Sequence, residues 1–225
     1  MSWKQRTDIP VYLFFEALVF AAIKFAELTS MPTQTTKIIM YSAIVGNTVM
    51  AVHLRTRYGK RDQLIFYALL VNCLADVFLT LTGGEQMFLP GFACFCTVEA
   101  IYAAYLRPDT RNLMIRAVVF AAALLLGHFM GMLTLPNALG LLNLTLVGVN
   151  AVCAWLTWRR ERTFPALLFA LGLTAFVIGD ISVALEITLP TGTAAQRIAA
   201  LAVWTFYVPA QVLIVLTYNE KVSAA

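Results

Sequence analysis

Eight long apolar runs divide this chain, and they constrain its fold more than any other feature. A helix needs about 20 mostly apolar residues to cross a bilayer. Each run approaches that length, and short connections containing Pro, Gly or polar residues separate them. The runs cover residues 10–29, 37–54, 63–82, 87–106, 113–133, 138–158, 165–187 and 197–218. We predict an all-α polytopic membrane bundle of eight transmembrane helices, forming one domain over residues 1–225.

The composition agrees with a membrane protein. Hydrophobic residues make up 60% of the 225 residues and charged residues only 12%, with a mean hydropathy of +0.79. A soluble domain of this length needs a more charged surface. The net charge of +4 does not indicate nucleic-acid binding, because the basic residues cluster between the apolar runs. In such positions Lys and Arg set membrane topology.

Basic residues occur in alternate connections. The second, fourth and sixth connections contain Arg55, Arg57, Lys60 and Arg61, then Arg107 and Arg111, then Arg159, Arg160 and Arg162. The first, third and fifth contain no Lys or Arg, and the seventh has only Arg197 at its end. Basic loops face the cytoplasm. We therefore expect an integral protein of the cytoplasmic (inner) membrane with both termini cytoplasmic, in agreement with Lys4, Arg6 and Lys221.

Two acids, Asp76 and Asp180, lie inside apolar runs. A charged side chain at the bilayer centre costs about 2.5–3.5 kcal/mol on insertion scales and usually faces a polar cavity. Each Asp lies about seven residues before the outer end of its run, which places both roughly 10 Å below the outer surface. We expect these two helices to stand side by side, with both carboxyl groups in one polar pocket open to the outer side.

Other polar residues in the runs have simpler interpretations that stay open. Lys24 and Glu27 are three residues apart and are expected to pair at the membrane interface. Lys37 begins a run and could serve only as an interfacial anchor. Tyr207 and Gln211 are one turn apart, and isolated polar residues of this kind often form hydrogen bonds between helices. Asn72 lies one turn before Asp76 and could donate a hydrogen bond to it. Asp76 would then have only a structural role.

The thiols and imidazoles do not predict a metal site. The chain has four cysteines, all in apolar runs, and only two histidines, His53 and His128. Cys94 and Cys96 are two residues apart and point to different faces of a helix. We interpret the cysteines as small packing residues and expect neither a metal nor another cofactor.

Short motifs surround the acids. They are Ala75-Asp76, Phe88-Leu-Pro-Gly91-Phe-Ala-Cys-Phe95, Glu99-Ala-Ile-Tyr102, Gly179-Asp180 and Tyr207-Val-Pro-Ala210-Gln211. In their order and spacing they resemble the YhhN-like family, which includes the lysoplasmalogenases. The resemblance extends over most of the chain, and Lys37 matches that family's Lys near the start of the second span. Three positions depart from the pattern: Ala75 replaces Gly, Glu99 replaces His, and Ile38 replaces the Pro after Lys37.

The resemblance implies a membrane hydrolase that cleaves the vinyl ether bond of lysoplasmalogen to a fatty aldehyde and a glycerophospho-alcohol, without a cofactor. Its partner would be a lysophospholipid or another membrane lipid. Two carboxyl groups suit this chemistry, one as acid and one as base, as in glycosidases. By this resemblance the catalytic residues are Asp76 and Asp180, and the substrate-binding residues are Lys37, Glu99, Tyr102, Tyr207 and Gln211.

Two alternatives remain beside the hydrolase. Buried acids also couple protons in transporters of lipids or small amphiphiles, although no pair of Gly/Pro-interrupted spans is evident here. The departures at Ala75 and Glu99 are compatible with a non-catalytic family member. A retinal-type photoreceptor is excluded, because the last two runs contain no Lys for a Schiff base.

Overall fold

The computed structural model describes residues 8–29, 31–58, 63–82, 84–107, 110–129, 131 and 133–223, and within them it contains helices and no strand. Eight of the helices are long and apolar enough to cross a membrane. In chain order the elements are α1 (Asp8–Leu28), α2 (Thr33–Tyr58), α3 (Gln63–Asp76), the π-helix η2 (Val77–Thr82), α4 (Glu85–Leu106), α5 (Thr110–Phe129), α6 (Leu135–Glu161), α7 (Phe164–Thr188) and α8 (Ala194–Ser223). The predicted all-α bundle of eight spans is confirmed.

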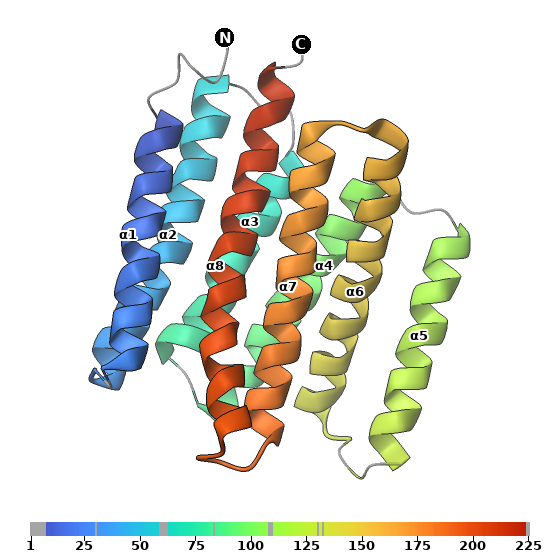
Figure 1. Cartoon of the computed structure of the whole chain (residues 1–225). Helices are drawn as coiled ribbons and strands as arrows, with labels where there is room; N and C mark the ends of the chain where they lie inside the picture. Colours follow the sequence, from blue (N-terminus) through green and yellow to red (C-terminus); the bar gives the residue numbers. More distant parts are fainter. Residues whose placement is uncertain are drawn as a thin grey trace.

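Successive helices run in alternate directions (Figure 1). The start of α1, the end of α8 and the described parts of the second, fourth and sixth connections therefore lie at one end of the bundle. This end, called the basic end below, includes Arg55, Arg57, Arg107, Arg159, Arg160 and Arg162. Other residues used to predict the topology, Lys4, Arg6, Lys60 and Arg61 and the side chains of Arg111 and Lys221, lie outside the described part of the chain.

Six helices form a closed ring. In order around it, α2, α3, α4, α6, α7 and α8 each pack against the next, and α8 packs against α2. Outside the ring, α1 packs against α2 and α8, and α5 packs against α6 (Figure 1). The predicted side-by-side packing of the two Asp-bearing helices is wrong, because the described residues of α3 and α7 do not contact each other. On one side of the ring α2 and α8 lie between them, and on the other side α4 and α6 do.

Local chemistry sets several helix ends. Thr134 and Thr163 cap α6 and α7, their Oγ1 atoms accepting hydrogen bonds from backbone N–H groups three residues later at 3.4 Å. A Pro follows in the first turn of each helix, where its missing N–H costs nothing. Helix α2 begins at Thr33, so Lys37 lies in its second turn. Hydropathy had predicted a later start, because it detects the apolar stretch of a helix and not a polar first turn such as Thr33 to Thr36.

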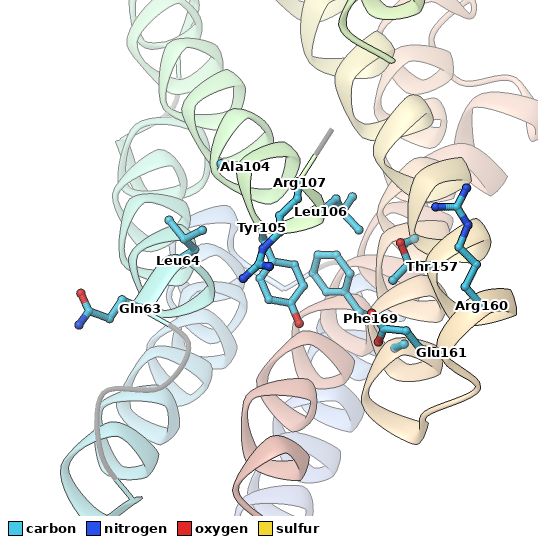
Figure 2. Close-up of a pocket in the computed structure, with 12 residues that line it drawn as sticks. Gln63, Leu64, Ala104, Tyr105, Leu106, Arg107, Thr157, Arg160, Glu161 and Phe169 are labelled. Carbon is cyan, nitrogen blue, oxygen red and sulfur yellow. The ribbon is translucent and has the colours of Figure 1, made fainter. Parts of the chain in front are cut away.

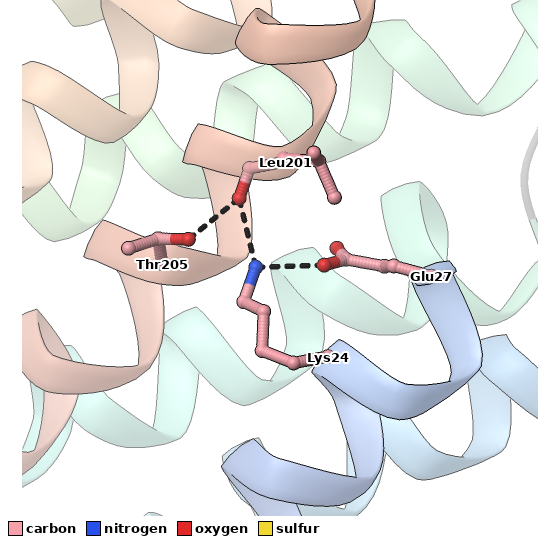
Figure 3. Close-up of polar contacts among 4 residues, drawn as sticks. All are labelled: Lys24, Glu27, Leu201 and Thr205. Atoms are coloured by element: carbon pink, nitrogen blue, oxygen red, sulfur yellow. Dashed lines mark hydrogen bonds and ion pairs between the residues drawn. The ribbon is translucent and has the colours of Figure 1, made fainter. Parts of the chain in front are cut away.

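Helix α8 packs closely against α7 at a glycine and is hydrogen-bonded to α1 through a lysine. A Cβ atom at Gly172 would lie 3.2 Å from the carbonyl oxygen of Ala210, so α7 and α8 approach closely at this point. Lys24 of α1 donates hydrogen bonds to Glu27 at 2.7 Å and to the Leu201 carbonyl of α8 at 2.8 Å (Figure 3). The predicted pairing of Lys24 with Glu27 is confirmed, and it also joins α1 to the ring.

Candidate active site

Asp76 ends α3 and lies in the ring with only 3% of its surface exposed. The Asn72 amide donates to its Oδ2 at 3.0 Å, the Tyr207 hydroxyl of α8 donates to the same oxygen, and the Thr80 hydroxyl donates to Oδ1 at 3.2 Å. The Asn72 amide also donates to the Tyr207 oxygen at 2.8 Å. A buried carboxylate is tolerated only when its oxygens are hydrogen-bonded. Both oxygens of Asp76 meet that condition.

A change of helix type follows Asp76. From Val77 to Thr82 the chain forms the π-helix η2, and the Thr82 hydroxyl donates to the Val77 carbonyl at 2.9 Å. Short π segments inside α-helices are rare and often occur at functional sites. On α4, a Cβ atom at Gly91 would lie only 2.4 Å from Cγ of Leu79. Gly91 thus allows α4 to pack against η2, the element that carries Thr80.

Asp180 of α7 is held from the neighbouring helix α6. The Asn143 amide donates to its Oδ2 at 2.7 Å, and the side chain is half-buried. Its carboxyl group lies within electrostatic range of Asp76. The two acids therefore face the same ring interior, although their helices do not touch.

A third carboxyl group, Glu99 of α4, also lies in the ring. The Asn150 amide of α6 donates to its Oε2 at 2.6 Å and to its backbone carbonyl at 2.9 Å. Asp180 and the buried guanidinium of Arg116 on α5 both lie within electrostatic range of Glu99. Arg116 thus brings one positive charge close to Glu99.

The asparagines of α6 were not among the predicted site residues. Asn143 and Asn150 are seven residues apart, so they share one face of the helix. Buried amides at this spacing in an apolar run were the signal that could have identified them. Thr80 lies four residues after Asp76, just as Asn72 lies four residues before it, so the same spacing could have identified it.

The remaining predicted residues differ in how closely they join the acids. Tyr102 is fully buried one turn after Glu99, and Gln211 is buried one turn after Tyr207. The Tyr102 hydroxyl has no hydrogen-bond partner among the described residues, whereas the Gln211 side chain lies within hydrogen-bonding range of Tyr207. Lys37 is half-buried, and within the described chain no hydrogen bond or ion pair joins it to another residue.

Carboxyl, amide and hydroxyl groups make up the site. Among the described residues, no three His, Cys, Asp or Glu side chains are placed so that they could hold a metal ion. All four cysteines are free thiols. The arrangement brings three acids from three helices into a largely buried space, where they can exchange protons with a bound molecule.

Comparison with known protein families agrees with the motifs. The YhhN family model matches residues 34–218. This chain belongs to the YhhN family. Neither the curated proteins nor the solved structures gave a match. The part matched by the YhhN model begins in α2 and ends in α8, so it includes all six ring helices and every predicted site residue, and it leaves out α1.

Proposed function

We propose that this YhhN-family protein is a membrane hydrolase that cleaves the vinyl ether bond of lysoplasmalogen, releasing a fatty aldehyde and a glycerophospho-alcohol. One observation supports this most directly. Asp76 and Asp180, from helices that do not touch, face one ring interior within electrostatic range of each other. Paired carboxyl groups in unequal environments can divide the roles of acid and base.

The hydrogen bonds favour Asp180 as the acid. Its carboxyl group accepts one hydrogen bond, from Asn143 to Oδ2, so Oδ1 is available to carry a proton. Donating that proton to the vinyl carbon remote from the ether oxygen converts the carbon beside the oxygen into an oxocarbenium ion. The Asp180 carboxylate formed in this step lies close to the new cation.

Asp76 is better suited to remain a carboxylate. Three side-chain donors, Asn72, Tyr207 and Thr80, point at its oxygens. Hydrogen bonds to an ionised acceptor are stronger than neutral ones. Asp76 takes a proton from water as the water oxygen bonds to the oxocarbenium carbon, which gives a hemiacetal.

Collapse of the hemiacetal completes the reaction. The bond between its carbon and the glycerol oxygen breaks, Asp76 gives its proton to that oxygen, and Asp180 takes the hemiacetal hydroxyl proton as the aldehyde forms. Both acids return to their starting states, and one water is consumed. Glu99, Tyr102, Tyr207 and Gln211 would orient water and glycerol, and Lys37 would bind the phosphate. Lys37 lies near the end opposite the basic end, about five residues into α2.

Aldehyde release from lysoplasmalogen by the detergent-purified protein tests this proposal. We expect Asp76→Asn and Asp180→Asn each to lower the rate by about 10²–10⁴-fold, the usual contribution of a positioned acid or base. Glu16→Gln is the matched control, since Glu16 is an equally buried carboxyl outside the ring. Wild-type rates in both folded Asp variants would reject the assignment.

A further inference from the structure

A cavity of about 600 Å³ opens at the basic end, between α3, α4, α6 and α7. Leu64, Tyr105, Arg107, Thr157 and Phe169 are among its lining residues (Figure 2). Arg160 and Glu161 add charged groups to its wall. Polar and charged walls of this kind bind water readily. The sequence predicted that the pocket around Asp76 and Asp180 opens at the opposite end of the bundle. That second opening stays a prediction.

Two aromatic residues of the cavity wall contact each other, and one of them contacts a third, buried ring. The Phe169 ring lies edge-on to Tyr105, with centroids 4.9 Å apart, and edge-on to Tyr102 at 5.5 Å. Phe169 and Tyr105 line the cavity (Figure 2). Tyr102 is not among the lining residues, and 0% of its surface is exposed. The Tyr102 ring thus joins the cavity wall to a buried hydroxyl that has no partner among the described residues.

Unpartnered polar atoms continue from Tyr102 to the acids. They are the Tyr102 hydroxyl and the Oδ1 atoms of Asn150, Asn143 and Asn72. Buried polar atoms in native proteins are nearly always hydrogen-bonded, to protein or to ordered water. No described protein group bonds to these four atoms.

Electrostatic and hydrogen-bond contacts give these atoms an order. Tyr102 lies within electrostatic range of Glu99, which bonds to Asn150. Glu99 lies within range of Asp180, which bonds to Asn143. Asp180 in turn lies within range of Asp76, whose partner is Asn72. The unpartnered atoms thus extend from the rings to the acid pair.

We propose that the basic-end cavity is the water inlet of the acid site, and that these polar atoms bind a file of water molecules from Tyr102 to Asp180 and Asp76. Asn143 and Asn150 are seven residues apart, about 10 Å along α6. Three or four waters about 2.8 Å apart bridge that length. The use of this water as the attacking nucleophile rests on the proposed hydrolase function, but the presence of the file does not.

Radical footprinting of the purified full chain tests for these waters. X-rays generate hydroxyl radicals from water, including ordered internal water, and mass spectrometry locates the oxidised side chains. We expect fast oxidation of Tyr102 although it is 0% exposed, and slow oxidation of Met50, which is 6% exposed and carries a more reactive thioether. Oxidation of Tyr102 no faster than that of Met50 would show a dry interior and overturn the proposal.

Blocking the cavity tests its role as the inlet. Ala166 lines the cavity one turn before Phe169, so Ala166→Trp should fill it and abolish the fast oxidation of Tyr102. The control, Ala184→Trp, places the same side chain at an exposed position near the far end of α7. Fast oxidation that persists in a folded Ala166→Trp protein would overturn the inlet. Because footprinting needs no turnover, absent aldehyde release with fast Tyr102 oxidation would reject the hydrolase and leave the inlet supported.

Discussion

Glu16 in α1 and Asp76 in the ring are equally buried carboxyl groups, each 3% exposed, yet their surroundings differ. Three side chains donate to Asp76. Among the described residues, the side-chain donor in range of Glu16 is the amide of Asn47, which also donates to the Ala43 carbonyl at 2.7 Å. Burial alone therefore does not distinguish a functional acid. Among the described carboxyl groups, Asp76 differs from Glu16 in the set of donors that several helices contribute to it.

Replacing each acid by leucine should give clearly different effects, and this is the largest difference we expect. Asp76→Leu leaves the Tyr207 and Thr80 hydroxyls without their acceptor, at a cost of about 1–3 kcal/mol for each buried group, whereas the Asn72 amide keeps the Tyr207 oxygen as an acceptor. Glu16→Leu removes a buried carboxyl with few donors and should be neutral or stabilising. Thermal unfolding in detergent measures both changes. Equal destabilisation by the two variants would remove the distinction between the sites.

Two glycines, Gly91 beside η2 and Gly46 beside α1, extend the comparison to side-chain packing. A Cβ atom at Gly91 would lie 2.4 Å from Cγ of Leu79, and one at Gly46 would lie 2.5 Å from the Phe15 ring. Gly91→Ala should cost about 1–3 kcal/mol by overpacking, and it should lower activity by shifting η2. Gly46→Ala should cost less, because the nearest atoms are the ends of two side chains, the 41% exposed Phe15 ring and Oε1 of Glu16 at 2.6 Å, which can move aside.

Melting temperature and aldehyde release, measured on both glycine variants, check this expectation. Full activity in Gly91→Ala would show that η2 does not position Asp76.

Two tyrosines give the smallest expected difference. The Tyr207 hydroxyl donates to the Asp76 carboxyl, and the Tyr12 hydroxyl donates to Oδ1 of Asn47 at 2.6 Å. A hydrogen bond to a charged group contributes about 1.5–3 kcal/mol and one to a neutral group about 0.5–1.5 kcal/mol. Tyr207→Phe should therefore destabilise the protein more than Tyr12→Phe, and only Tyr207→Phe should slow aldehyde release. A rate unchanged in Tyr207→Phe would exclude a positioning role for the hydroxyl.

The sequence predicted the helices well because a bilayer fixes their length. Apolar runs identified all eight spans, and the alternation of basic connections agrees with the described basic residues at one end of the bundle. Asp76 and Asp180 were recognisable because a carboxyl in an apolar run is costly and must have a partner. Short motifs added the other site residues, and the family match covers all of them.

Three features of the site could not be predicted in this way. The π-helix η2 packs against Gly91 of another helix, a contact between parts of the chain that no local pattern indicates. The bonds from Asn143 and Asn150 to the acids require α6 to lie between α4 and α7. The separation of α3 from α7 by other helices of the ring contradicts the simplest arrangement of two matching acids.

The sequence by itself determined which residues lie at which depth, because a spanning helix converts position along the chain into height across the membrane. Only the tertiary structure decided which helices are neighbours and which donors meet each acid. The physical reason is that lipid chains are as apolar as leucine, so an apolar helix face gains little hydrophobic energy by choosing protein over lipid. Close packing and hydrogen bonds between helices therefore decide which helices become neighbours. These contacts join distant parts of the chain.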